Sequence, residues 1–128
     1  MKLFCHIIFI LLLFQPLALS EDFVVYNVQK ALSFGNDEVL EKDYFINMGH
    51  QNGLRVGSIL DVYRKISSYD VRTEKLYLNV TFPFARLKVI HVENQLAIAR
   101  LEKFLPPEKT PVFFPPGVMA GDIVKKAE

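Results

Sequence analysis

Residues 84–101 read FARLKVIHVENQLAIARL, and this stretch predicts the fold class. Its first half alternates charged and apolar side chains, as in Arg86-Leu87-Lys88-Val89, which is the period of a half-buried strand. Glu93-Asn94 marks a turn, and a second apolar run follows it. We therefore expect a long β-hairpin. The return strand carries Ala97 and Ala99, which suit the narrow interior of a tightly curved barrel.

Two further strands are expected before this hairpin, at residues 43–48 and 58–64, because apolar side chains recur there at every second position. Residues 49–57 between them hold three glycines and an Asn-Gly pair, so we expect positive φ at Asn52 or Gly53. This pattern predicts a tight loop that joins the two strands in a hairpin. The candidate structural turn residues are Gly49, Asn52, Gly53 and Gly57, together with Gly121 and Asp122 before the last strand.

The other segments complete the prediction of an all-β fold. Residues 23–28 are rich in β-branched and aromatic side chains and favour a strand. Residues 65–82 are less regular, with a short edge strand expected at 75–81. Five prolines between Leu105 and Gly117 predict a stiff loop, and a final short strand follows at 119–125. We expect a small barrel of about five to seven strands at 43–126, preceded by an N-terminal strand and linker at 21–42.

Residues 1–20 have the layout of a secretory signal peptide. Lys2 is followed by an apolar run from Leu3 to Phe14, and small residues stand at Ala18 and Ser20. The run is shorter than the roughly 20 residues that a membrane-spanning helix needs, which favours cleavage over an uncleaved anchor. We expect a signal helix cleaved between Ser20 and Glu21, no transmembrane span in the mature chain, and a periplasmic or secreted protein.

The composition argues against several function classes. Cys5, the only cysteine, leaves with the signal, so the mature chain can form neither a disulfide nor a thiolate metal site. Fifteen Lys and Arg residues include Lys2, so cleavage leaves fourteen basic against fourteen acidic side chains. This balance gives no electrostatic footprint for nucleic acid.

Catalysis, metals and cofactors are not expected. His50 and His91 are the only mature histidines, and a metal site would need them to converge with carboxylates, which the sequence does not indicate. The three glycines of residues 49–57 lack the Lys-Ser/Thr of a phosphate-binding loop. No serine stands in a nucleophile motif, and no pair of aspartates has a spacing that singles it out. We expect a protein that is not an enzyme.

Phe113 and Phe114 are the candidate partner contacts, because the prolines on either side hold the backbone of the pair. Both rings folding back to cap one end of the barrel is the alternative. Strands 75–81 and 23–28 are candidate open edges that accept or donate a strand to another chain.

The glycine loop flanked by Tyr44-Phe45-Ile46-Asn47-Met48 and Leu60-Asp61-Val62-Tyr63-Arg64, with the closing Gly121-Asp122-Ile123-Val124, resembles the C-terminal domain of flagellar assembly protein T. The resemblance covers about residues 43–126. It implies an SH3-like β-barrel in the periplasm. Such proteins carry other domains before the barrel, and we expect a stand-alone version of the module here.

The resemblance implies a non-catalytic protein-interaction module, an accessory or assembly factor of an envelope complex such as the flagellar basal body. The alternative is a soluble periplasmic protein that binds a small ligand or peptide between the proline loop and the barrel. A pocket lined by Phe104, Phe113 and Phe114 would support the alternative.

Overall fold

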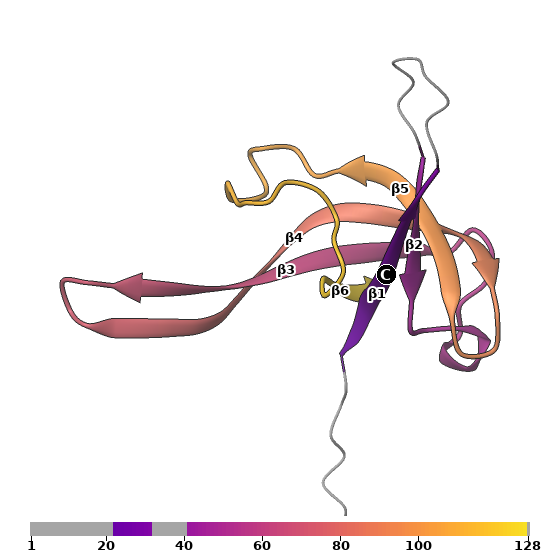
Figure 1. Cartoon of the computed structure of the whole chain (residues 1–128), viewed down its shortest axis with the longest axis horizontal. Coiled ribbons are helices and arrows are strands. Elements are labelled where there is room, and N and C mark those ends of the chain that lie inside the picture. The colour runs from indigo at the N-terminus through magenta and orange to yellow at the C-terminus, as the bar shows by residue number, and fades with distance from the viewer. Residues whose placement is uncertain (1–21, 32–40, 128) are drawn as a thin grey trace, which may run out of the picture.

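The computed structural model describes residues 22–31 and 41–127, so the expected signal segment and its cleavage site lie outside the described residues. Six antiparallel strands form a closed barrel in the order β1-β2-β5-β4-β3-β6 (Figure 1). The strands are β1 (Phe23–Lys30), β2 (Lys42–Ile46), β3 (Ile59–Asp70), β4 (Lys75–Val92), β5 (Ala97–Phe104) and β6 (Ile123–Lys126). A single 3-10 turn, η1 (His50–Asn52), lies between β2 and β3. The all-β barrel expected from the sequence is confirmed.

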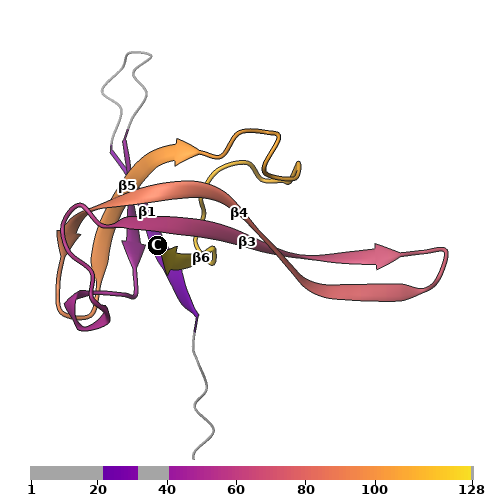
Figure 2. The same ribbon diagram turned by 180° about the vertical axis from the view of Figure 1, so that it is seen from behind.

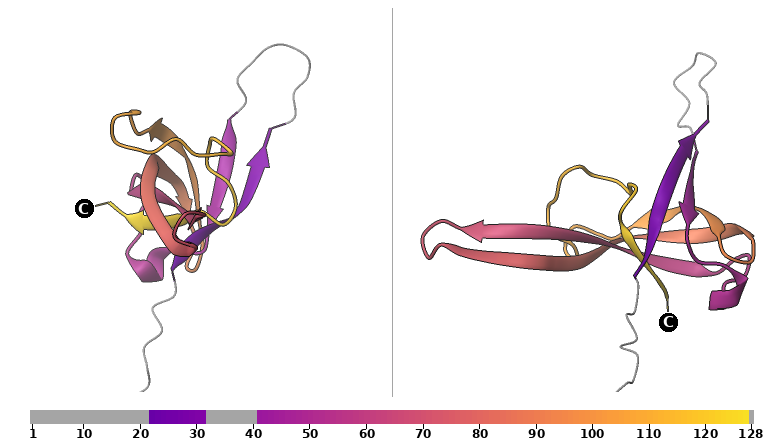
Figure 3. Two further views of the ribbon diagram at one scale, coloured as in Figure 1. Left: turned by 90° about the vertical axis from the view of Figure 1, so that its left-hand side faces the viewer. Right: turned by 60° about the horizontal axis from the view of Figure 1, so that its bottom comes forward.

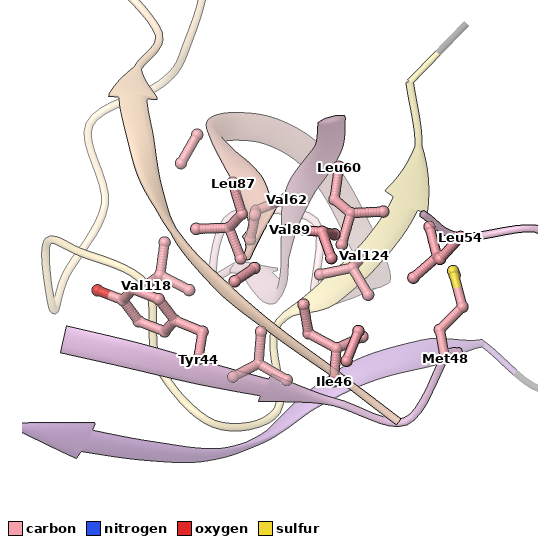
Figure 4. Close-up of a cluster of buried hydrophobic side chains, with 14 of the residues drawn as sticks. Tyr44, Ile46, Met48, Leu54, Leu60, Val62, Leu87, Val89, Val118 and Val124 are labelled. Carbon is pink, nitrogen blue, oxygen red and sulfur yellow. The ribbon is translucent and has the colours of Figure 1, made fainter. Parts of the chain in front are cut away.

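The core of the barrel is made of apolar side chains that point inward from every second position of the strands. Leu60 and Val62 of β3 and Leu87 and Val89 of β4 are all at most 1% exposed. Figure 4 shows these side chains converging on Ile46 from β2. Inward positions on β5 are the fully buried alanines expected for a narrow barrel, Ala97 and Ala99.

The hairpin predicted for residues 84–101 forms between β4 and β5. Its register pairs Val89 with Ala99 and Val92 with Ala97. Glu93 N donates to Leu96 O at 2.8 Å and closes the turn at the expected place. Sequence alternation located this hairpin because both strands have one buried and one exposed face.

The predicted hairpin between the strands on either side of residues 49–57 is wrong. β2 pairs with β1 and β5, whereas β3 pairs with β4 and β6. The glycine segment docks on the β4–β5 turn instead, since His50 N donates to Glu93 O at 3.0 Å and Gln51 N donates to Asn94 O at 3.2 Å. This docking carries the chain across the end of the barrel to its opposite wall.

Gly49 and Gly53 each meet a local requirement of that crossing. A Cβ on Gly49 would lie 2.6 Å from the backbone oxygen of Asn94, so only glycine allows this approach. Gly53 ends η1 in the left-handed region at φ 84°. Asn52 Oδ1 accepts from Gly49 N at 3.1 Å. Positive φ is also found at the other two predicted turn glycines, Gly57 and Gly121.

β1 is part of the barrel wall. It pairs with β2 along Asn27–Lys30 and with β6 at Phe23 and Val24, and so closes the sheet. The strand expected ahead of the 43–126 unit is therefore one of the six strands of the barrel, and Val25 is fully buried in the core.

The irregular stretch after residue 64 forms a two-stranded projection that we call the arm, residues 65–81. β3 and β4 continue together past the barrel, and the arm extends well beyond the other strands (Figures 1 and 2). The expected edge strand at 75–81 is not separate, because it is the first part of the 18-residue β4. Pro83 sits in β4 next to a register shift, where the regular ladder is interrupted.

Candidate functional site

The arm carries many exposed apolar side chains. Every residue from 65 to 81 is exposed apart from Asp70, which is half-buried. Seven of these residues are large and apolar: Ile66, Tyr69, Val71, Leu76, Tyr77, Leu78 and Val80. Leu78 and Val71 are 65% and 79% exposed. Contiguous apolar surface of this kind marks interaction sites in soluble domains.

Both faces of the arm carry these side chains. Ile66 lies opposite Val80 in the register, and Tyr69 lies opposite Leu76. Opposite residues share a face, and residues an odd number of positions apart on a regular strand point to opposite faces. The register shifts between Ile66 and Ser68 because β4 has one extra residue there, so the alternation stays regular on β3, where Ile66 and Tyr69 are three positions apart. The two pairs are therefore on different faces. Figure 3 shows that no other described strand covers either face.

The two outer edges of the arm are also open within the described residues. β6 pairs with β3 only as far as Tyr63, and β5 pairs with β4 only from Ala85 onward. The backbone N–H and C=O groups along the outside of Lys75–Leu78 therefore face no other described strand. A two-stranded ribbon with an open edge offers a template for an added strand.

The base of the arm is held by a buried ion pair that the sequence analysis missed. Arg64 Nη2 donates to Asp122 Oδ2 at 2.9 Å, and the same guanidinium donates to the backbone oxygens of Pro115 at 2.8 Å and Gly117 at 2.7 Å. Both charged residues are buried. Asp122, expected only as a turn residue, also accepts from Met119 N at 2.8 Å. The alternation Leu60-Val62-Arg64 was the available signal, because it places Arg64 on the inward face.

Aromatic rings pack against this buried ion pair, which together with them we call the clamp. The two phenylalanines named as partner contacts lie in different environments. The Arg64 guanidinium lies 4.8 Å from the ring centroid of Phe84 and 4.9 Å from that of Phe113. Phe113 also packs against Phe82, at 5.4 Å between centroids. Phe114, by contrast, is 89% exposed. Only one member of the pair therefore caps the barrel, and only the other is presented to solvent.

A groove of about 370 Å³ lies between the proline segment and the barrel. Its lining residues are Glu41, Lys42, Tyr44, Leu101, Phe104, Pro116, Gly117 and Val118. Phe104 takes part as expected, whereas Phe113 and Phe114 do not. Tyr44 and Val118 lie side by side at this end of the core (Figure 4). Burial, assisted by the charge of Glu41, raises the pKa of the Tyr44 hydroxyl above its ordinary value of 10.0.

The two histidines have separate environments. His91 Nε2 lies 2.8 Å from Glu93 Oε1 on the surface, whereas His50 belongs to η1. Among residues 22–31 and 41–127, no three His, Cys, Asp or Glu side chains gather in a way that could hold a metal ion. Within the same residues, no helix has the length and apolar character to cross a membrane.

The chain matches no protein-family model, and a search of curated proteins finds no relative. The resemblance to the flagellar assembly protein T domain thus remains a prediction from turn glycines and strand alternation. Any functional statement has to rest on the surfaces described above.

Proposed function

We propose that this chain is a non-catalytic protein-interaction module of the periplasm, an accessory or assembly factor of an envelope complex such as the flagellar basal body. The arm is its binding element. The supporting observation is the apolar surface of the arm, which is exposed on both faces in the described part of the chain. Export rests on the signal pattern of residues 1–20, and the SH3-like assignment rests on the resemblance.

The exposed surface of the arm supports binding because it has no evident role in stabilising the barrel. An isolated two-stranded hairpin is at best marginally stable in water. Leu76 and Leu78 lie far along the arm and belong to no part of the buried core. Docking a partner against them would remove their apolar area from water, at roughly 25 cal/mol per Å². The open edge of Lys75–Leu78 adds backbone hydrogen bonds to the same contact.

The test is affinity purification from gently solubilised envelopes of the native host. The Leu76→Ser/Leu78→Ser variant should lose the co-purifying proteins, because it removes apolar area at the end of the arm. Val56→Ser is the matched control, since Val56 is an exposed aliphatic residue of a turn on the barrel. Equal recovery of the same partners by the arm variant and the control would contradict the proposal.

The second candidate function is the binding of a small ligand or peptide in the groove beside the proline segment. Its supporting observation is the volume of about 370 Å³ next to Tyr44 and Phe104. Native mass spectrometry of the purified chain distinguishes the two functions. A retained small molecule that is lost in Phe104→Ser and kept in Leu76→Ser/Leu78→Ser would favour the groove over the arm.

A further inference from the structure

The groove beside the proline segment lies where the wall of the barrel opens. β2 pairs with β5 only from Tyr44 to Ile46, whereas β5 continues along β4 as far as Phe104. The two strands therefore separate beyond Tyr44, and residues 116–118 of the proline segment line the third side of the gap. The resulting volume of about 370 Å³ is within the range of small-molecule sites, which is roughly 300–1,000 Å³.

The Tyr44 hydroxyl is a polar group of this groove without a partner in the described part of the chain. Tyr44 is only 4% exposed, and its ring lies beside Val118 (Figure 4). Among residues 22–31 and 41–127, no hydrogen bond joins this hydroxyl to another group. In the same ranges, the buried side-chain atom that lacks both a partner and solvent contact belongs to Thr110. The Tyr44 hydroxyl therefore keeps some contact with solvent, and the groove that Tyr44 lines provides it.

The charges around this hydroxyl disfavour a charged ligand. Burial and, to a smaller extent, the charge of Glu41 raise the pKa of Tyr44, so the potential at the hydroxyl is unfavourable for an anion. A cation gains little, because Lys42 lines the groove beside Glu41 and offsets its charge. Transferring a charge from water to an apolar wall is costly. The apolar side chains that line the groove are Leu101, Phe104, Pro116 and Val118.

We propose that the groove binds an uncharged small molecule with an apolar body and a carbonyl oxygen, which accepts a hydrogen bond from the Tyr44 hydroxyl. This inference rests on the second candidate function and does not depend on the arm. Tyr44 is the residue that determines specificity, because a phenolic O–H donates one hydrogen bond and here has no acceptor among the described residues. The half-exposed ring of Phe104 packs against the apolar body and loses contact with water.

Size and polarity favour a small molecule over a peptide. The volume of about 370 Å³ is near the lower end of the range for ligand sites. Each peptide residue would also bring a backbone N–H that needs an acceptor. The Gly117 oxygen at the groove already accepts from Arg64 Nη2 at 2.7 Å. A ketone or ester brings an acceptor and no donor, which matches the single hydroxyl of Tyr44.

The test compares benzophenone with diphenylmethane, which has the same two rings and no carbonyl oxygen. Amide chemical-shift titration of the purified chain measures the affinity for each probe. Wild type should bind benzophenone about two- to tenfold more tightly, the gain expected from one hydrogen bond. Tyr44→Phe should abolish this preference and leave the affinity for diphenylmethane unchanged. Tyr77→Phe, which removes a hydroxyl from the exposed arm, is the matched control and should keep the preference.

The outcomes separate this inference from the groove function on which it rests. Equal affinity of wild type for both probes, with both lost in Phe104→Ser, would overturn the role of Tyr44 and leave the groove as a binding site. Absence of binding of either probe would overturn both. Tighter binding of N-acetyl-phenylalaninamide than of benzophenone would assign the groove to peptides and overturn the inference. The melting temperature of Tyr44→Phe at neutral pH should be unchanged or higher, because the lost hydroxyl is unpaired in the described residues, so weaker binding would not reflect unfolding.

Discussion

Arg64 Nη2 donates to Asp122 Oδ2 at 2.9 Å although the two residues are 58 positions apart in the sequence. The guanidinium also donates to two backbone oxygens of the proline segment and lies against the rings of Phe84 and Phe113, which contact each other. One residue at the base of the arm therefore connects β3, the strand-free segment after β5, and the turn before β6. This contact positions the proline wall of the groove.

Arg64→Met should destabilise the protein by about 3–5 kcal/mol, because it leaves the Asp122 carboxylate buried without a partner. Urea denaturation measures the change. Arg86→Met is the matched control, since Arg86 pairs with Asp61 in a partly exposed position and should cost no more than about 1 kcal/mol. Equal losses in the two variants would show that Arg64 does not hold the proline segment in the way described.

Gly49→Ala should destabilise the barrel by about 3 kcal/mol, at the upper end of ordinary single substitutions. The added methyl group would meet the backbone oxygens of Glu93 and Asn94, which cannot move without opening the β4–β5 turn. Gly57→Ala is the comparison. It has open space around it but positive φ, so about 1–2 kcal/mol is expected from backbone strain alone. Thermal unfolding of both variants would show which substitution lowers stability more. A larger loss of stability in Gly57→Ala would contradict the docking of the glycine segment.

Amide hydrogen exchange should be faster in the arm than in the barrel parts of the same two strands. Amides of residues 66–70 and 75–80 are in a two-stranded ribbon, whereas those near Leu60 and Leu87 are in the closed sheet over the core. Local opening of the arm breaks few buried contacts, so it costs little free energy. Equal protection in the isolated chain would mean that something already covers the arm.

Alkaline pH should destabilise the protein partly through Tyr44. Its pKa in the folded state is raised above 10.0, mainly by burial, so the neutral hydroxyl is favoured in the fold. The unfolded chain loses this proton at a lower pH than the folded one. The stabilisation that the neutral Tyr44 hydroxyl gives the folded state is therefore complete below pH 10.0, and it is lost as pH rises through the folded-state pKa.

Comparing urea denaturation of wild type and Tyr44→Phe between neutral pH and pH 11 checks this effect. The variant should lose less stability on the alkaline side. Tyr77→Phe, on the exposed arm, is the control and should follow the wild-type profile. Parallel profiles for wild type and Tyr44→Phe would contradict the assigned role of burial.

Local pattern predicted much of the barrel wall. Alternation predicted the β4–β5 hairpin and the inward residues Leu60 and Leu87, and the prolines predicted the strand-free segment after β5. These features depend on a residue and its near neighbours. A strand with one solvent-exposed and one buried face shows the two-residue alternation of polar and apolar side chains directly in its sequence.

Only the tertiary structure determined three features: which strands pair with β2, that Arg64 is buried against Asp122, and that residues 65–81 project from the barrel. Strand pairing between distant segments is a non-local choice, so glycines that looked like a hairpin turn between β2 and β3 instead carry the chain across the barrel end. Arg64 looked like one more strand-end charge until Asp122 and the proline segment enclosed it. Apolar alternation is the same in a barrel wall and in a projecting ribbon, so the sequence could not say that Leu76 and Leu78 lie outside the core. That distinction depends on what packs over a strand, which only the assembled fold determines.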